Sequence, residues 1–319
     1  KGMALLYSEI AFDREAASNL LQFLPEASQA NIQSKLNECE KLFTFDQHFD
    51  LLDQIKDLLA IIKAVEHDLL QSSVVVGIEV TGAVAESTPP ESVEAVEAKK
   101  QPTALSAAML AAFIESSPMY VIGQEKVREC QHLSDDIEDH TTWTPTTSID
   151  EKGYGTYYRA EVGKTAHSFK VIGEVQESIL HVVSVIMELD LYTEWFPMCC
   201  EAEMQGELTR FHKSSRFVVQ VPWPMSNREV FLVGYGVDDL TTRKRVIITS
   251  RSVADSEKLH SNIRRPPVGK KCTRISVEKG GFLLEALSPN SCRISFIMNV
   301  DPEIPHIGCT DHLTHSPFY

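Results

Sequence analysis

The feature that most constrains the fold is the second half of the sequence, where short strand-like segments follow one another with one helix among them. β-Branched and aromatic residues with glycines dominate from about Gly153, a composition typical of strands. A helix is predicted over residues 178–189, with Ser178 as its N-cap. The strands predicted after it are Phe211–Val221, Val230–Val237, Arg245–Ser252, Thr273–Lys279, Phe282–Leu287 and Cys292–Val300. Because most links are short, the sequence predicts an α+β fold with a curved, mostly antiparallel sheet.

The first half is instead helical. Apolar residues recur at spacings of three and four, and we predict helices that include Glu26–Phe43, with Pro25 in its first turn, and a later helix capped by Asp46. We therefore expect an all-α hairpin or bundle over residues 1–78. Its apolar stripe indicates a core, and a groove that binds a protein partner is the alternative.

A solvated linker is predicted over residues 79–103, where large apolar residues are few. Thr103 then caps an Ala-rich helix that reaches about Glu115, and we expect the second domain to occupy residues 104–319.

The net charge and the cysteines limit the possible binding partners and the cellular location. The formal net charge is −15, and residues 1–140 alone hold 24 acids and 10 bases, which argues against general nucleic-acid binding. The seven cysteines form no Cys-x-x-Cys motif, which favours a reducing, cytoplasmic location. No apolar run approaches the roughly 18 residues of a membrane-spanning helix.

Three segments of the second half carry a family resemblance. They are Asp-Leu-Tyr-Thr-Glu-Trp-Phe-Pro at 190–197, Val-Pro-Trp-Pro-Met-Ser-Asn-Arg-Glu at 221–229, and Gly-Gly-Phe at 280–282 followed by Asp-Pro-Glu-Ile-Pro at 301–305. Together they resemble the START domain, the lipid-binding module of the helix-grip fold, over about residues 140–305. The residue sequence of the second segment most resembles that of the phosphatidylcholine-transfer branch.

The second segment also has a physical meaning of its own. Its two prolines remove ladder donors, so a strand must break there. Arg228 and Glu229 are expected to anchor the turn, because a guanidinium makes forked bonds to carboxylate or carbonyl oxygens.

The resemblance implies a hydrophobic cavity that binds lipid. We expect ligand contact from apolar residues that ordinary core packing would also explain: Trp195, Phe217, Val219, Trp223, Leu232 and Phe296. Gly234 falls where sterol-binding relatives tend to carry an inward arginine, and the usual carboxylate partner is absent too. This departure favours a phospholipid, a fatty acid or another amphipath over a sterol.

The C-terminal segment departs further from the family. START domains continue into a long helix that covers the cavity, whereas Ile304–Tyr319 contains two prolines and no amphipathic period. We expect this helix to be missing, which leaves the N-terminal helices as the candidate cover. The tail contains metal-binding side chains: His306, Cys309, Asp311, His312 and His315. The spacing Cys-x-x-His-x-x-His matches no zinc motif. We expect no metal and no cofactor.

A basic segment lies between Arg243 and Lys279, with 11 bases, 3 acids and no aromatic residue that could stack on a nucleic acid. The family's gating loop falls within it, at about Ala254–Lys271. We expect a transient contact with an anionic membrane surface, and a solvated loop is the alternative. The candidate membrane-facing residues are Arg264, Arg265, Lys270 and Lys271.

The sequence contains no catalytic motif, so we do not expect an enzyme. The predicted function is lipid binding in a hydrophobic cavity, for transfer between membranes or for sensing, in a cytoplasmic protein peripheral to membranes. One alternative is a regulatory or scaffold protein whose N-terminal helices bind a protein partner, with a START-like domain that is sensory or has lost its ligand. A helix-grip hydrolase or cyclase is the third hypothesis.

Overall fold

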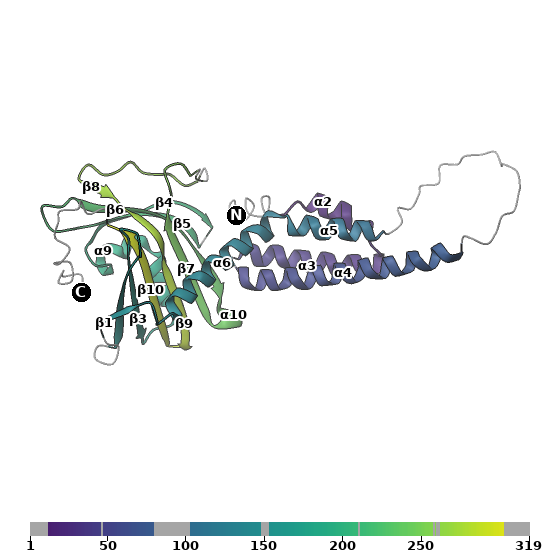
Figure 1. Ribbon diagram of the computed structural model, residues 1–319, viewed down its shortest axis with the longest axis horizontal. Helices are drawn as coiled ribbons and strands as arrows, with labels where there is room; N and C mark the ends of the chain where they lie inside the picture. Colours follow the sequence, from purple (N-terminus) through teal and green to yellow (C-terminus); the bar gives the residue numbers. More distant parts are fainter. Residues whose placement is uncertain are drawn as a thin grey trace, which may run out of the picture. The chain divides into compact units, whose positions relative to one another are not determined.

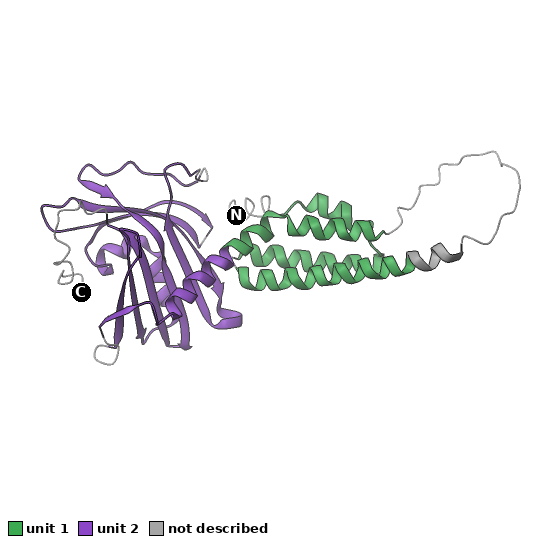
Figure 2. Ribbon diagram, in the orientation of Figure 1, with its two compact units in different colours: residues 1–125 green, residues 126–319 purple. Residues whose placement is uncertain are grey.

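The computed structural model describes residues 12–302, apart from 46, 80–102, 148–152, 210, 258 and 260–261. The chain divides into two compact units, residues 1–125 and residues 126–319 (Figures 1 and 2). Each unit has its own core, and each is described by itself.

The first unit is helical. Its elements are α2 (Arg14–Leu21), α3 (Glu26–Thr44), α4 (His48–Glu79), α5 (Ala104–Glu115) and the first residues of α6 (Pro118–Glu138). The core consists of leucines, isoleucines and Phe43 that recur at helical spacing on these elements, as the predicted apolar stripe requires. Pro25 occupies the N-cap of α3, one position before the expected first turn.

The helix α5 lies in the first of the two compact units. Thr103 caps α5 as predicted, because its hydroxyl accepts a hydrogen bond from the Ser106 amide at 3.3 Å. However, α5 packs into the helical unit through Leu110 and Ile114, which are fully buried there. The compact units divide after Glu125, whereas the expected second domain begins at residue 104, because the apolar face of α5 completes the helical core.

The second unit is built on one large sheet. The strand order is β1-β2-β3-β10-β9-β7-β6-β5-β4, and every neighbouring pair with a described register is antiparallel. The strands are β1 (Thr144–Thr147), β2 (Tyr154–Ala160), β3 (His167–Val175), β4 (Cys199–Thr209), β5 (His212–Val219), β6 (Asn227–Asp239), β7 (Arg245–Ser252), β8 (Cys272–Arg274), β9 (Ser276–Ser288) and β10 (Ser291–Asp301). The short β8 lies off this path and pairs with β6 in parallel. The predicted mostly antiparallel sheet is confirmed.

Several predicted boundaries were wrong. The segments Thr273–Lys279 and Phe282–Leu287 belong largely to a single strand, β9, which continues through Gly280 and Gly281. The strand β4 was not predicted, because its polar sequence lacks the alternation of a half-buried strand.

Helices lie on the two faces of this sheet. The helix α8 (Ile179–Met187), the 3₁₀ turn η1 (Leu189–Leu191) and the short α9 (Tyr192–Trp195) lie on one face. The Ser178 hydroxyl caps α8, as predicted, by accepting a hydrogen bond from the His181 amide at 3.3 Å.

The second half of α6 lies on the other face. The Tyr235 hydroxyl of β6 contacts the carboxylate of Glu129 on α6. A Cβ atom at Gly281 of β9 would lie 2.1 Å from the Ile248 carbonyl and 2.8 Å from the Leu133 side chain of α6. Glycine therefore lets β9 approach both β7 and α6.

In the part of the chain that the structure describes, no single helix has the length and hydropathy of a bilayer span. The pair α5 and α6, bent by 47° at the break between them, reaches those values only when both helices are taken together.

Candidate functional site

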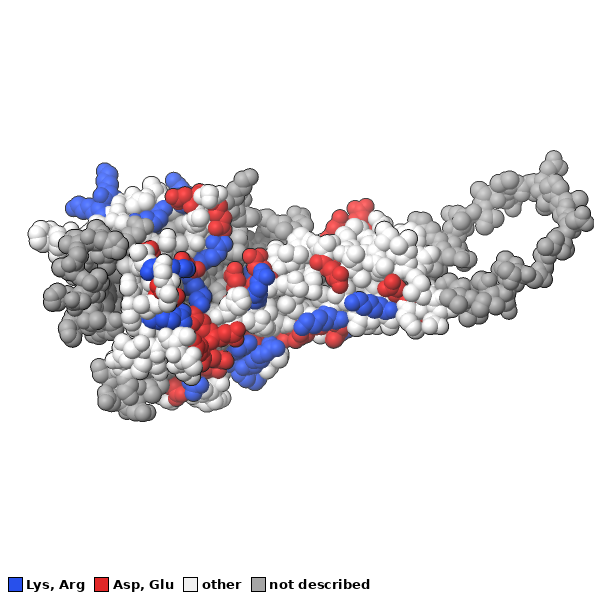
Figure 3. Space-filling model, viewed as in Figure 1, with Lys and Arg blue, Asp and Glu red and all other residues white. Residues whose placement is uncertain are grey.

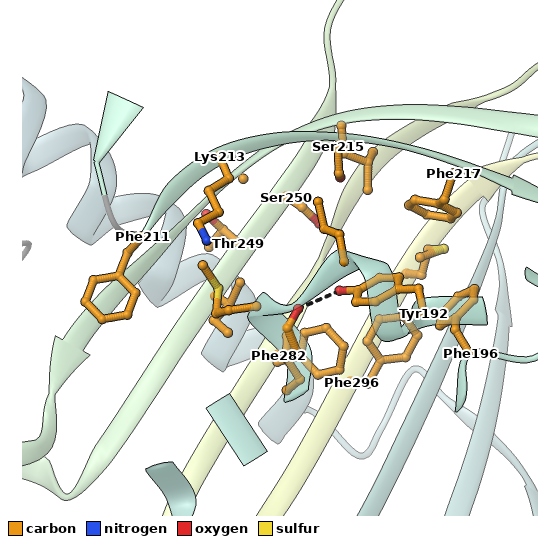
Figure 4. Close-up of a pocket in the computed structure, with 17 residues that line it drawn as sticks. Tyr192, Phe196, Phe211, Lys213, Ser215, Phe217, Thr249, Ser250, Phe282 and Phe296 are labelled. Carbon is orange, nitrogen blue, oxygen red and sulfur yellow. Dashed lines mark hydrogen bonds between the residues drawn. The ribbon is translucent and has the colours of Figure 1, made fainter. Parts of the chain in front are cut away.

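The face of the sheet that carries α8 and α9 contains a cavity of about 90 Å³ (Figure 4). Its walls come from α8, η1 and α9 on one side and from β5, β6, β7, β9 and β10 on the other. Most of the lining is apolar. The aromatic residues are Tyr192, Phe196, Phe211, Phe217, Phe282 and Phe296, and the aliphatic ones are Ile186, Met187, Leu189, Leu232, Ile248 and Met298.

Two aromatic groups shape this lining. The rings of Phe282 and Phe296, on neighbouring strands, lie 4.7 Å apart. Phe196 packs edge-on against Phe217 at 5.6 Å and stacks on Tyr192 at 5.9 Å. These contacts hold α9 and the turn after it against β5, so the cavity wall is made of packed rings.

The Tyr192 hydroxyl fixes the same corner. It donates a hydrogen bond to the Ile186 carbonyl at 2.9 Å, shown dashed in Figure 4, and so ties α9 to the end of α8. Burial raises the pKa of Tyr192 to about 12, so the phenol stays neutral at physiological pH.

A polar section interrupts the apolar lining. It contains Lys213 and Ser215 from β5, Ser250 from β7, and Gly234 and Thr249 beside them. Figure 4 shows Lys213 extending from its strand toward the middle of the cavity. The cavity therefore has the composition of a site for an amphipathic ligand, with a large apolar wall and a few polar groups.

Comparison with known proteins identifies the second unit. A family model described as "START domain" matches residues 126–312, more than half of the chain. The chain belongs to the START domain family. The match begins where the second unit begins, and the α+β helix-grip fold expected from the sequence is confirmed.

Solved structures similar to the chain include three with related names. Human STARD10 shares 20% identity at a TM-score of 0.47, covering 56% of this chain and 68% of that one. Human StAR-related lipid transfer protein 5 shares 14% identity at a TM-score of 0.48, and the match covers 57% of this chain and 84% of that one. A STAR-related lipid transfer protein from Xanthomonas axonopodis shares 19% identity at a TM-score of 0.43. The match covers 51% of this chain and 85% of that one. No curated protein sequence matches the chain, so the family assignment rests on the family match.

Half of the residues expected to touch a ligand line the START cavity: Phe217, Leu232 and Phe296. Val219 packs in the adjoining cluster around Phe217 without reaching the lining. The odd positions of β5 and even positions of β6 therefore face the cavity, a choice of face that the sequence of β6 leaves open.

The two tryptophans lie elsewhere. Trp223 is 92% exposed, because Pro222 and Pro224 hold it in the turn between β5 and β6. Trp195 is 38% exposed and packs its ring against Tyr192, behind the cavity wall. Neither tryptophan is among the residues that line the cavity in this structure.

Other lining residues were not predicted. Phe211, Lys213 and Ser215 share a face with Phe217, and strand alternation was the signal that could have identified them. Tyr192 and Phe196 are positioned by the contacts of α9, which sequence alternation does not reveal.

Of the four basic residues expected to face a membrane, three are exposed and one is half-buried. Arg264, Lys270 and Lys271 are exposed. Arg265 is half-buried, contacts the carboxylate of Asp255 and donates to the Ala254 carbonyl at 2.6 Å. Arg265 therefore stabilises the loop between β7 and β8, to which it and its two partners belong.

Arg228 and Glu229 anchor their surroundings, as expected from the turn sequence. Arg228 donates to the Pro302 carbonyl at 3.0 Å and to the Ser226 carbonyl at 2.7 Å. Glu229 is fully buried and accepts hydrogen bonds from Arg216 at 2.8 Å, from Arg274 at 3.0 Å and from the Gly269 amide at 3.1 Å.

This arrangement keeps Glu229 ionised. Burial acts to raise the pKa of Glu229, but the hydrogen bonds from Arg274, Gly269 and Arg216 outweigh it and lower that pKa. The buried charge is thereby compensated, and one carboxylate connects β5, β6, β8 and the loop that contains Gly269.

Among the described residues, no group of three or more metal-binding side chains comes together. The segment Ile304–Tyr319, where a C-terminal helix was expected to be missing, lies outside the described residues. The same holds for the tail's metal-binding side chains, His306, Cys309, Asp311, His312 and His315.

Proposed function

We propose that the START domain of this protein binds an amphipathic lipid in the cavity under α8 and α9, without catalysing a reaction on it. The observation that carries this proposal is the composition of the lining, which combines aromatic and aliphatic walls with one polar section. A cavity of this kind removes an acyl chain from water while the polar residues orient its head group. Phe217, Leu232 and Phe296 are the proposed contacts for the apolar part.

The size of the cavity adds a condition. Its volume of about 90 Å³ lies below the roughly 300–1,000 Å³ of typical ligand pockets. Ligand entry therefore requires the lining side chains to separate, and a single acyl chain demands less separation than two.

The proposed membrane contact lies at the end of the sheet where β6 begins. Trp223 and Met225 are exposed in the turn before β6, and Val268, Lys270 and Lys271 are exposed in the loop before β8. The two segments are neighbours, because Asn227 pairs with Cys272 and the hydroxyls of Ser226 and Thr273 lie 2.6 Å apart. Figure 3 shows basic side chains projecting at the end of the second unit where β8 lies.

Such a surface suits an anionic membrane. Lysines near acidic head groups contribute about 1 kcal/mol each, and an exposed tryptophan partitions to the interface. We therefore propose a cytoplasmic protein that contacts membranes transiently at this surface, with Arg264 as a further basic residue.

Lipid recovery tests the proposed function. The full chain would be incubated with mixed phospholipid vesicles, isolated again by gel filtration, extracted and examined by mass spectrometry. We expect about one lipid per protein, and phosphatidylcholine among the recovered species would support the resemblance to the phosphatidylcholine-transfer branch. Transfer between labelled donor and acceptor vesicles then separates a transfer protein from a sensor. Protein that is folded but recovers no lipid would contradict the proposal.

A scaffold function is the second candidate. Leu105 and Met109 lie one helical turn apart on α5 and are 70% and 51% exposed. Exposed apolar residues at this spacing are typical of a helix face that binds a protein partner. This function becomes the preferred one if no lipid is recovered.

A further inference from the structure

Lys213 is a basic residue in a cavity lined by no acidic residue. The 17 residues that line the cavity include one cation, Lys213, and no aspartate or glutamate. A charged amine beside an apolar wall has lost part of its hydration, and that loss is costly unless another group compensates it.

The protein itself supplies no such group among the residues that the structure describes. The strand register places Glu207 of β4 opposite Lys213, but these two side chains form no ion pair within 4.0 Å. On the other neighbouring strand the residue opposite Lys213 is Gly234, which has no side chain to offer. Other basic residues of this unit that are not exposed have partners: Arg216 contacts Glu229, and Arg159 contacts Asp136. The fully buried Lys170 donates to the carbonyls of Ile137 and Asp139.

Hydroxyl groups surround the same position. Ser215 lies two residues after Lys213 on the same face of β5, and Ser250 of β7 neighbours Gly234. A Cβ atom at Gly234 would lie 3.2 Å from the Ser250 Cβ and 2.7 Å from the Thr249 carbonyl, so the close approach of β6 and β7 requires glycine opposite Lys213. Lys213 and the two serines are the hydrogen-bond donors that an anion requires.

The apolar residues lie along the strand from this position. Phe217 is four residues from Lys213 on β5, which is roughly 13 Å of strand. Phe211, two residues before Lys213, is also in the lining, so aromatic rings lie on both sides of Lys213 along the chain. The spacing between Lys213 and Phe217 matches the length of a short acyl segment.

We infer that the cavity selects an amphipath whose polar end is negatively charged, a carboxylate or a phosphate, which Lys213 binds with help from Ser215 and Ser250. This inference rests on the proposed lipid-binding function and specifies its ligand class. The anion supplies the negative countercharge for the Lys213 amine. The acyl chain lies against Phe217, Phe282 and Phe296.

A matched series of twelve-carbon probes tests this assignment by calorimetry on the full chain near neutral pH, below the concentration at which the probes aggregate. The series is dodecanoate, dodecyl phosphate, methyl dodecanoate and dodecylamine, which share the chain and differ in the charge of the polar end. We expect the two anions to bind at least about tenfold more tightly than the ester and the amine, as charge-assisted hydrogen bonds predict. The relative affinity of the two anions shows whether the site prefers carboxylate or phosphate.

The variants then assign the preference to one residue. Lys213→Met should reduce the affinity for the anions about tenfold, to that of the ester, and leave ester binding unchanged, while Lys213→Arg should keep the preference. Lys271→Met, which removes an exposed lysine outside the cavity, is the matched control and should behave like the wild type. If Lys213→Met does not fold, Lys213→Gln and the wild-type probe series still decide the question.

Two results would overturn the inference while leaving lipid binding intact: equal wild-type affinity for anion and ester, or an anion preference that survives Lys213→Met. Wild-type protein that binds none of the four probes and recovers no lipid would instead contradict the proposed function, and the inference would fail with it.

Discussion

Asp136 and Arg159 form a forked ion pair, in which one guanidinium nitrogen donates to Oδ1 at 2.7 Å and the other to Oδ2 at 3.2 Å. Asp136 is on the last turns of α6 and Arg159 is on β2. The same carboxylate contacts Lys279 of β9, and the Arg159 guanidinium lies 4.2 Å from the ring of Trp143. These contacts attach the end of α6 to two strands of the sheet.

Asp136→Asn should therefore destabilise the START domain. The substitution removes the carboxylate partner of Lys279 and leaves Arg159 paired with Glu161 alone. We expect a loss of about 1–3 kcal/mol in the free energy of unfolding. Chemical denaturation followed by tryptophan fluorescence measures it. Asp135→Asn removes an exposed carboxylate from the neighbouring position and serves as the control, with an expected change within about 0.5 kcal/mol. Equal stability of the two variants would contradict the role assigned to this ion pair.

The pH dependence of stability provides a separate test. Burial acts to raise the pKa of Asp136, but hydrogen bonds from Arg159 and Lys279 outweigh it, so the pKa in the folded protein is lowered from 3.8. The stabilisation is present above about pH 4 and is lost as the pH falls through the lowered folded pKa. The difference in Tm between the wild type and Asp136→Asn should thus be constant from pH 7 to about pH 5 and shrink in more acidic buffers. A difference that stays constant into strong acid would show that the carboxylate is not the source of the stabilisation.

Filling the cavity should prevent lipid uptake. Leu232 is buried in the lining, and Leu232→Trp would occupy much of the space at a cost of about 1–3 kcal/mol from overpacking. We expect vesicle-exposed Leu232→Trp protein to recover little or no lipid while it remains folded by circular dichroism. Leu287→Trp introduces the same ring at an exposed position of β9 outside the lining and should recover lipid normally. Normal recovery by Leu232→Trp would locate the lipid elsewhere.

The sequence predicted the helix-grip fold of the second unit because turn chemistry and strand composition agree there. The prolines around Trp223 interrupt the sheet between β5 and β6, as two missing ladder donors require. The same reasoning failed for Trp223 as a cavity residue, because residue type does not reveal whether a side chain in a turn faces inward or outward.

Two structural features depend on contacts between distant segments. The assignment of α5 to the helical unit depends on burial of Leu110 and Ile114 by helices far away in the sequence. The inward face of β6 depends on its register with β5, where Lys213 opposes Gly234. A one-residue shift would reverse that face without altering the composition of the strand.

Glu229 should control the order of the loop before β8. Glu229→Gln removes the charge shared by Arg216 and Arg274, and we expect a loss of about 3 kcal/mol in the free energy of unfolding. Amide hydrogen exchange at residues 266–271 should become faster, because the Gly269 amide donates to this carboxylate. Glu257→Gln, in an exposed pair with Arg251, is the control and should cost at most about 1 kcal/mol. Unchanged exchange in the loop would show that Glu229 stabilises only the strands.

Membrane association should depend on the basic residues beside Trp223. Replacing Lys270 and Lys271 by serine should weaken cosedimentation with vesicles of acidic lipid about tenfold or more, at about 1 kcal/mol per lysine. Salt should weaken wild-type binding in the same way, since the Debye length falls from about 10 Å at 0.1 M to about 3 Å at 1 M. The matched control replaces Lys244 and Arg293, which lie toward the opposite end of the sheet, where β6 ends and β10 begins.

Two outcomes distinguish the source of vesicle binding. Trp223 is almost fully exposed. If Trp223→Ala binds vesicles more weakly than the wild type at high salt as well as at low salt, the apolar part of the contact is assigned to Trp223. Equal vesicle binding by the two double variants would contradict a membrane contact at this end of the sheet.

The alternation of side chains along β6 has an evolutionary consequence. Gly234 faces the cavity, whereas the next residue, Tyr235, contacts Glu129 of α6 on the opposite face. Ligand preference and helix attachment are thus encoded at alternate positions of one strand. Point substitutions at cavity positions that have room for another side chain, such as Leu232, can diversify what the protein binds without loosening α6. A one-residue insertion would exchange the two sets and disrupt both. Descendants of such a chain can change their ligand by substitution and should accumulate length changes only outside this strand.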